Sequence, residues 1–260
     1  MADVGIQAWI GRPRTRWLAR PSGAAAAAVL GFSILFLAAP QIDLWASGLF
    51  WSPAGFELAQ SPLLKALRKS SSWVLGLILL GVLATLITHA VRRDWAALGA
   101  ARRCWFLLAG LAVGPGLVVN TVLKDGWGRP RPNAVDVFGG EAPYVPVWEI
   151  SDWCERNCSF VSGEASSAAW MVAAAVVLAP ARWRMGVIWS AVVYAVALSL
   201  NRLAFGGHFL SDIVLSWAVT ALILSLLAQV MLAPTAAAAR RRARRRRSRP
   251  ARPTPASQTA

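Results

Sequence analysis

Residues 201–231 read NRLAFGGHFLSDIVLSWAVTALILSLLAQVM, and the rest of the chain is best understood from this segment. Its second part, 213–231, is apolar and close to the roughly 20 residues that a helix needs to cross a bilayer. Its first part places Arg202, His208 and Asp212 directly before that apolar run. Charged groups at membrane depth are costly unless solvated or paired, and for that reason they are functional candidates. The segment predicts a membrane helix with a polar site at one end.

Apolar runs of this kind recur along the chain, which is 57% hydrophobic. They predict an all-α, polytopic membrane protein with six helices, at about 24–39, 73–91, 105–123, 165–178, 185–200 and 213–231. The expected organisation is a cytoplasmic segment over 1–22, a membrane domain over 23–233 with its motifs in 124–212, and an Arg-rich disordered tail over 234–260.

Positive charge predicts the orientation of the bundle. Arginine clusters precede the first helix, lie between the second and third and between the fourth and fifth, and follow the sixth, so they share one side. Lys and Arg mark the cytoplasmic side, which places both termini there and the loops 41–71, 124–164 and 201–211 outside, facing the periplasm from an inner membrane. Lys65, Arg68 and Lys69 break this pattern, and we interpret Leu63–Lys69 as an amphipathic segment at the membrane interface. Asp43, among tryptophans, suits the same headgroup region.

The net charge of +15 does not indicate a nucleic-acid partner. Most of the excess lies in the tail RRRARRRRSR at 240–249, which has no interleaved aromatic residues to stack on bases. A basic block beside a final membrane helix is typical of contact with anionic lipid headgroups. The expected partners are the bilayer, these headgroups and a lipid substrate, and no obligate protein partner is inferred.

Two of the three cysteines, Cys154 and Cys158, lie in the long outer loop. A loop outside the cytoplasm is in an oxidising compartment, so we expect a disulfide between them. The alternative is a metal site, but two thiols without a nearby histidine make half a zinc site at best.

Three polar clusters lie at helix ends on the outer side, and their chemistry converges on phosphate. Lys124, with Arg131 or Arg129, and Arg202 supply ammonium and guanidinium donors for phosphoryl oxygens. Taken singly, Lys124 and Arg202 are more typical of cations that anchor helix ends. The backbone of Ser162 and Gly163 precedes a helix, where N–H groups favour an anion.

The nucleophile in this interpretation is His208, which attacks phosphorus with one ring nitrogen. Asp212 follows it by four residues, the spacing that puts two side chains on one helical face, and is expected to hold the other nitrogen. Glu164 is the candidate general acid for the leaving oxygen, a role that requires it to be protonated.

These residues resemble the motifs of the type-2 phosphatidic acid phosphatase superfamily, over roughly residues 70 to 230. The pattern Lys-x6-Arg-Pro matches Lys124, Arg131 and Pro132, and Ser-Arg-x5-His-x3-Asp is met by the segment Asn201–Asp212. Pro-Ser-Gly-His is met only in part, by Val161–Glu164, because glutamate stands where the family has its acid histidine.

The resemblance implies a six-helix core with its active site at the outer membrane face. His208 would form a phosphohistidine that water hydrolyses, Asp212 would orient it, and Lys124, Arg131, Arg202, Ser162 and Gly163 would hold the phosphate, without a metal or other cofactor. The implied activity is that of a lipid phosphatase acting on a phosphate monoester or diphosphate, with undecaprenyl diphosphate, phosphatidylglycerol phosphate, phosphatidate and lipid A phosphates as candidates.

Glu164 leaves two alternatives open beside hydrolysis. Phosphohistidine chemistry also permits transfer to a lipid hydroxyl. An inactive relative with a binding or structural role is motivated by the missing histidine. If Glu164 is the acid, we expect an acidic optimum or a leaving group that needs little protonation.

Overall fold

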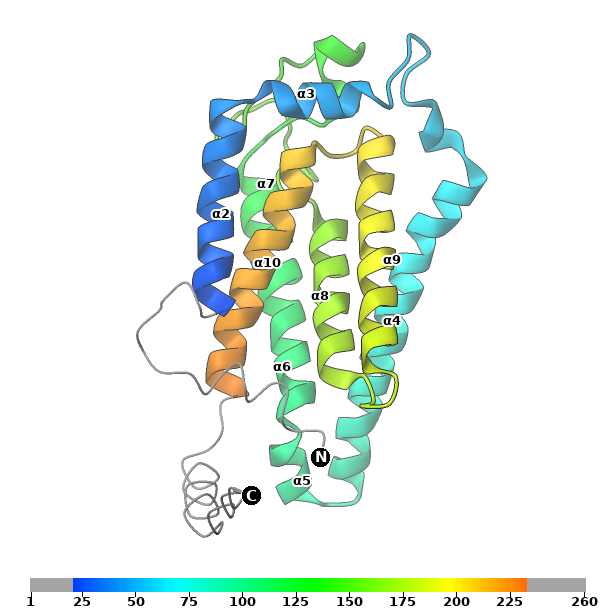
Figure 1. Ribbon diagram of the computed structural model, residues 1–260, viewed down its shortest axis with the longest axis vertical. Coiled ribbons are helices and arrows are strands. Elements are labelled where there is room, and N and C mark those ends of the chain that lie inside the picture. The colour runs from blue at the N-terminus through cyan, green and yellow to red at the C-terminus, as the bar shows by residue number, and fades with distance from the viewer. Residues whose placement is uncertain (1–20, 233–260) are drawn as a thin grey trace, which may run out of the picture.

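The computed structural model describes residues 21–232, and the N-terminal 1–20 and the Arg-rich tail from 233 onward lie outside the described residues. Figure 1 shows a bundle of long helices whose polypeptide crosses repeatedly between two ends. The helices are α2 (Pro21–Ala38), α4 (Pro62–Val91), α6 (Arg102–Leu111) with its continuations η3 (Ala112–Leu123) and α7 (Lys124–Gly126), α8 (Gly163–Leu178), α9 (Arg184–Ala204) and α10 (Leu210–Met231).

Five of these helices are long and apolar enough to cross a membrane, counting Arg102–Gly126 as one span. The exception is α8, which has 16 residues. The described chain is therefore all-helical and polytopic, as predicted. The shorter elements are α3 (Gln41–Gly48), η2 (Glu57–Gln60), α5 (Trp95–Ala100), η4 (Pro132–Ala134) and η5 (Asp136–Phe138).

Helix α3 and the long connection between α7 and α8 lie at the same end of the bundle, where α9 also passes into α10 (Figure 1). Helix α5 lies at the opposite end. The three loops predicted to share a side do so, and all the predicted site residues belong to that end.

The segment Leu63–Lys69 differs from its prediction. It is not a separate interfacial helix, because α4 begins at Pro62 and continues without a break to Val91. Proline at the first helical position suits a helix start, since its missing N–H has no intrahelical partner there. The basic residues of this segment are thus fixed on the first turns of a membrane helix.

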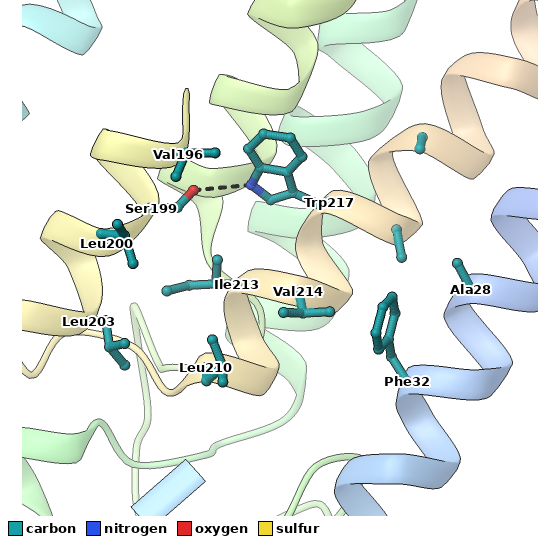
Figure 2. A pocket seen from close by; sticks show the side chains of 12 residues that line it. Ala28, Phe32, Val196, Ser199, Leu200, Leu203, Leu210, Ile213, Val214 and Trp217 are labelled. Atoms are coloured by element: carbon teal, nitrogen blue, oxygen red, sulfur yellow. Dashed lines mark hydrogen bonds between the residues drawn. The ribbon is translucent and has the colours of Figure 1, made fainter. Parts of the chain in front are cut away.

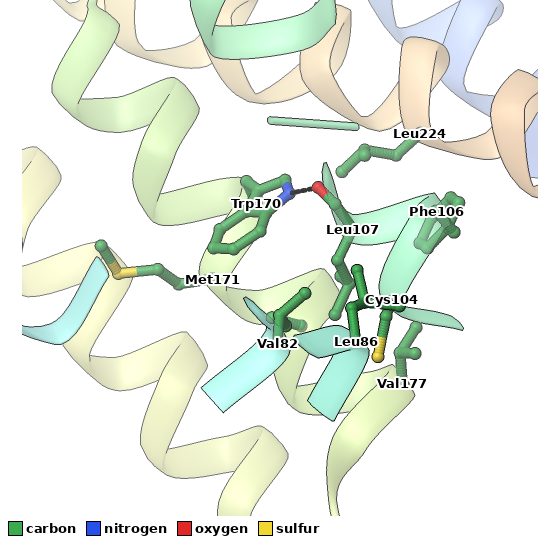
Figure 3. Packing of buried hydrophobic residues seen from close by; sticks show 10 residues of the cluster. Val82, Leu86, Cys104, Phe106, Leu107, Trp170, Met171, Val177 and Leu224 are labelled. Atoms are coloured by element: carbon green, nitrogen blue, oxygen red, sulfur yellow. Dashed lines mark hydrogen bonds between the residues drawn. The ribbon is translucent and has the colours of Figure 1, made fainter. Parts of the chain in front are cut away.

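The core half-way along the bundle is built around Trp170 of α8. Its indole nitrogen donates a hydrogen bond to the carbonyl oxygen of Leu107 at 2.9 Å, and both side chains are fully buried. Val82 and Leu86 of α4 and Leu224 of α10 belong to the same cluster (Figure 3). Buried indole N–H groups need a partner, so this bond fixes α8 against α6.

The Gly114-Pro115-Gly116 step lies in the π-helical segment η3. Proline cannot donate to the helical ladder. Two side chains bond to carbonyls five residues earlier: Asn120 Nδ2 donates to Pro115 at 2.7 Å, and Thr121 Oγ1 donates to Gly116 at 3.3 Å. π-Segments are common at functional sites, and this one brings Asn120 against the start of α8.

Candidate active site

The end of α9 places His208. The helix ends at Ala204, and Gly206 adopts φ +60°, a left-handed conformation that glycine takes without strain. The N–H of Gly206 donates to Leu203 at 3.0 Å and that of Gly207 to Arg202 at 3.1 Å, which is a Schellman cap. A β-carbon on Gly207 would collide with the guanidinium of Arg202, so the two glycines let the loop return over this arginine.

The imidazole of His208 is buried, and its Nδ1 lies 2.8 Å from the carbonyl oxygen of Ser159. A carbonyl only accepts, so Nδ1 carries the proton and Nε2 keeps its lone pair. Burial, followed by the charges of Arg202, Arg131 and Lys124, lowers the pKa of His208 well below its ordinary value. The imidazole is therefore neutral near pH 7, as a nucleophile must be.

Asp212 is not the acceptor that the sequence predicted. His208 precedes α10 rather than lying on it, and Asp212 Oδ2 is 3.9 Å from Nδ1. Oδ2 instead accepts from Ser159 Oγ at 2.5 Å and from the Phe209 N–H at 2.8 Å. Asp212 thus holds both the residue that carries the acceptor and the residue that follows His208.

Arg129 binds the other oxygen of Asp212 and is fully buried. Its Nη1 lies 2.6 Å from Asp212 Oδ1, and its Nη2 lies 2.8 Å from Asp43 Oδ2. Burial alone would lower the pKa of Arg129, but the charges of Asp212 and Asp43 outweigh it and raise the pKa. Both carboxylates already occupy this guanidinium, so of the two arginines considered for phosphate, Arg129 is the structural one.

Asp43 was expected near lipid headgroups, but its side chain is fully buried. Besides Arg129, it accepts from the Ser211 N–H at 2.8 Å and from Ser211 Oγ at 2.5 Å. This network ties α3 to the start of α10. No local signal in the sequence marks Asp43, because its side-chain partners are 86 or more residues away.

His208 is within the electrostatic influence of three cations, since the charges of Arg131, Lys124 and Arg202 each lower its pKa. Arg202 belongs to the last turn of α9, not to the loop that follows, and is almost fully buried. Arg131 is fixed by the carbonyl of Asn157, at 3.1 Å from Nε and 2.6 Å from Nη2. Burial, then the charge of Arg68, lowers the pKa of Arg131. The three predicted cations therefore all contribute to the positive electrostatic potential at His208.

Ser162 is the N-cap of α8, and its Oγ accepts from the Ala165 N–H at 3.3 Å. Its own N–H donates to the Asp212 carbonyl at 3.2 Å, so this group is not available to an anion as predicted. Gly163 is the first residue of α8, where an N–H has no intrahelical acceptor. A β-carbon on Gly163 would collide with the side chain of Asn120, which explains the glycine.

Glu164 pairs with two arginines. Its Oε1 lies 2.8 Å from Nε of Arg68, and its Oε2 lies 3.3 Å from Nε of Arg202. The second contact lacks hydrogen-bond geometry, and both of its atoms are buried without a hydrogen-bond partner. An ion pair requires the charged carboxylate, so a role as acid requires Glu164 to leave these partners first. The sequence missed Arg68, which it assigned to the interface.

The predicted Cys154–Cys158 disulfide is confirmed. It closes the loop that carries Asn157, the acceptor for Arg131, and it directly precedes Ser159, the acceptor for His208. The disulfide therefore lies beside two contacts that position site residues. Among residues 21–232, no group of three or more His, Cys, Asp and Glu side chains is placed to hold a metal ion.

Comparison with known proteins finds one matching family model and several related proteins. A model described as the PAP2 superfamily matches residues 103–235, about half of the chain. A protein named lipid A 4'-phosphatase from Francisella tularensis subsp. novicida is 43% identical over 126 residues, 45% of this chain and 57% of that protein. Proteins of the same name from Rhizobium etli (40% over 117 residues, 45% of each chain) and Rhizobium leguminosarum (43% over 110 residues, 42% of this chain and 47% of that one) also match.

The chain spans about half the length of the curated relatives it matches. No solved structure matches. The matched region includes Lys124, Arg131, Arg202 and His208, and it spans the part of the bundle from α6 to α10. On this match, the chain belongs to the PAP2 superfamily.

Proposed function

We propose that this protein is a membrane phosphatase that hydrolyses a phosphate on a lipid through a phosphohistidine at His208. The carrying observation is the hydrogen bond from Nδ1 to the Ser159 carbonyl, which leaves Nε2 unprotonated in a field of three cations. A neutral imidazole with one nitrogen held and the other free is the form that attacks an electrophile.

In the first step, Nε2 of His208 forms a bond to phosphorus while the bond from phosphorus to the lipid oxygen breaks. Negative charge on the phosphoryl oxygens is stabilised by Lys124, Arg131 and Arg202, assisted by the first N–H groups of α8. In the second step, water attacks phosphorus, the bond from phosphorus to Nε2 breaks, and Glu164, left as a carboxylate by the first step, takes a proton from the water, which releases inorganic phosphate and the free imidazole. Asp212 acts through Ser159 and Phe209, whose positions it fixes.

Glu164 is the proposed proton donor to the leaving lipid oxygen. Its partner Arg202 is also a proposed phosphate ligand, so an incoming phosphate competes with Glu164 for this guanidinium. Displaced from the arginine, Glu164 would be released to contact the leaving lipid oxygen. Substrate binding would thus convert Glu164 from an ion-pair partner into an acid.

A lipid substrate is supported by an apolar groove on the membrane-spanning surface. The groove has a volume of about 470 Å³ and lies between α2, α9 and α10. Figure 2 shows Phe32 of α2 on one side, Leu200 and Leu203 of α9 on the other, and Leu210 of α10 between them. Leu203 and Leu210 flank the loop that carries His208, so an acyl chain in this groove would approach the site.

Among the candidate lipids, a phosphate of lipid A is the first to test, because three relatives carry the name lipid A 4'-phosphatase. Arginine clusters at one end support an inner-membrane location with the site facing the periplasm and the tail against anionic headgroups. Transfer to a second lipid hydroxyl stays the alternative for the same intermediate.

The deciding experiment measures inorganic phosphate released from these lipid phosphates by purified protein in neutral detergent. We expect release by the wild type and a loss of about three orders of magnitude or more in His208→Ala, as for other nucleophiles. Equal release by the variant would reject His208. If the phosphate is instead found on an added acceptor lipid, and is lost from the substrate only when that lipid is present, the reaction is transfer.

A further inference from the structure

The first turns of α4 carry a basic face that the proposed reaction does not use. Lys65, Arg68, Lys69 and Ser72 are spaced at i, i+3, i+4 and i+7, which is one side of a helix. All four are exposed. The face lies at the end of the bundle that holds His208, where positive charge departs from the orientation pattern of the other loops.

This face lines a polar pocket of about 360 Å³ together with Ser71 and Glu164. The volume falls within the range of about 300–1,000 Å³ typical of small-molecule sites. Three cations and one carboxylate line it, and that carboxylate is shared with Arg202. Within residues 21–232, the side chain of Lys69 makes no hydrogen bond or ion pair, and the ammonium group of Lys65 bonds only to the side chain of Gln60, at 2.9 Å.

The pocket adjoins the phosphate site through one residue. Glu164 contacts Arg68 on the pocket side and Arg202 on the site side. The charge of Arg68 also reaches Arg131 and lowers its pKa. An anion in the pocket and a phosphate at His208 would therefore be neighbours within one positive field.

We propose that the Lys65–Arg68–Lys69 face is a second anion site, which binds a second phosphate or carboxylate on the polar headgroup of the substrate. The proposal rests on the proposed phosphatase function and narrows its substrate class to lipids whose headgroup carries two anionic groups. Such an anion would also take Arg68 from Glu164, as the reacting phosphate takes Arg202. Occupation of both sites would leave Glu164 without its two cation partners.

The test uses two synthetic lipids with the same acyl chains and the same scissile phosphate. One carries a second phosphate on its headgroup, and the other a hydroxyl in its place. The variant is Lys65→Gln/Lys69→Gln, which removes two exposed charges and leaves Arg68 paired with Glu164. The matched control is Arg92→Gln/Arg103→Gln, which removes two exposed charges at the opposite end of the bundle.

In phosphatidylcholine vesicles, the wild type is expected to prefer the lipid with two phosphates. The ratio of kcat/KM for the two lipids should fall about tenfold in the lysine variant, since two charge-assisted contacts are lost. The control should keep the wild-type ratio. An unchanged ratio in the lysine variant overturns the second anion site, provided that the wild type hydrolyses either lipid.

Binding separates this proposal from the phosphatase itself. In a His208→Ala background, the affinities for the two lipids should differ, and Lys65→Gln/Lys69→Gln should remove the difference. This result would support the site even if neither lipid is hydrolysed, whereas equal affinities would overturn it. A lysine effect that appears only in vesicles with added phosphatidylglycerol, on both lipids alike, would assign the face to bilayer headgroups and also overturn it.

Discussion

Arg129 and Asp212 form an ion pair with 2.6 Å between Nη1 and Oδ1, and both side chains are fully buried. The pair links the loop after α7 to the first turn of α10 and, through Ser159, to the imidazole of His208. Asp212 thus helps to hold the structure around His208 in place.

Replacing Asp212 by Asn should destabilise the protein and slow the reaction. The amide leaves Arg129 with one of its two anionic partners, and breaking a buried ion pair costs about 3 kcal/mol or more. A lower Tm in detergent, together with a lower kcat, is the expected result. Ser159→Ala keeps the ion pair and loses one hydrogen bond, worth about 1 kcal/mol, so its effect should be smaller. A Tm for Asp212→Asn equal to that of Ser159→Ala would contradict this account.

Glu164 offers a prediction about proton donation. Glu164→Gln keeps the size of the side chain but cannot supply a proton, so kcat should fall by about 100-fold, as for a lost general acid. Glu164→His restores the residue of the family motif and should retain more activity than the glutamine variant. The comparison should be made on two phosphate monoesters that differ in the leaving group.

The choice of leaving group separates the acid from a merely structural Glu164. A leaving group that needs no proton, such as p-nitrophenolate, should be far less sensitive to Glu164→Gln than an alkoxide. Equal losses on both substrates would indicate that Glu164 only holds Arg68 and Arg202, with which it forms ion pairs.

The sequence predicted the bundle because apolar runs of bilayer length have few alternative structures. It also singled out His208, Lys124, Arg131 and Arg202, because cations and a histidine at membrane helix ends are rare enough to be informative, and the charges of these three cations do act on His208 in the structure. What it could not predict is pairing across the chain. Asp43 is 86 residues from Arg129, and Arg68 is 96 residues from Glu164. Such partners share no spacing, and their burial follows only from the packed bundle.

The nearest acceptor for His208 illustrates the same limit. The i+4 spacing favoured Asp212 on the premise of a helix, but the two glycines at 206 and 207 end α9 before His208. The acceptor is then a backbone carbonyl, that of Ser159. Every residue type has a carbonyl, so no pattern of side chains could have revealed this one.

The close approach of Asn120 to Gly163 predicts a compensating pair of substitutions. Gly163→Ala should destabilise the protein by about 1–3 kcal/mol, because the added methyl group collides with the Asn120 side chain. Asn120→Ala makes room at the cost of the bond to Pro115. The double variant should be more stable than the sum of the two single losses predicts, by thermal unfolding in detergent. Strict additivity would show that the methyl group is accommodated elsewhere.

The disulfide predicts a redox effect on activity. Cys154→Ser/Cys158→Ser frees the loop that holds Arg131 through Asn157, so KM should rise several-fold. Reduction of the wild type by a small dithiol should have the same effect. Cys104→Ser removes the buried free cysteine and serves as the control. Because this variant keeps the disulfide, its KM should still rise when the reductant is added. A wild type whose KM is unchanged after complete reduction would contradict the positioning role.

The depressed pKa of His208 predicts the acid limb of the pH–rate profile. An unperturbed histidine titrates near 6.5, and the pKa of His208 lies well below this value. The nucleophile therefore stays neutral as the pH falls through 6.5, and kcat/KM should decline only at lower pH. Arg131→Gln removes a charge that lowers the pKa, so it should move this limb to higher pH as well as lowering the rate. Arg156→Gln should leave the acid limb in place. Arg156 lies in the same loop as Arg131 but is not among the groups that change the pKa of His208.

The same shift predicts how stability depends on pH. Below 6.5 the unfolded chain protonates this histidine while the folded protein does not, so the free energy of unfolding falls as the pH decreases from 6.5 toward the folded pKa. Above 6.5 neither state binds the proton, and this contribution is fully present and constant. His208→Gln should flatten the acid side of a plot of Tm against pH, compared with the wild type. An unchanged slope would mean that His208 binds its proton equally well in the folded and unfolded protein, which would contradict the lowered pKa.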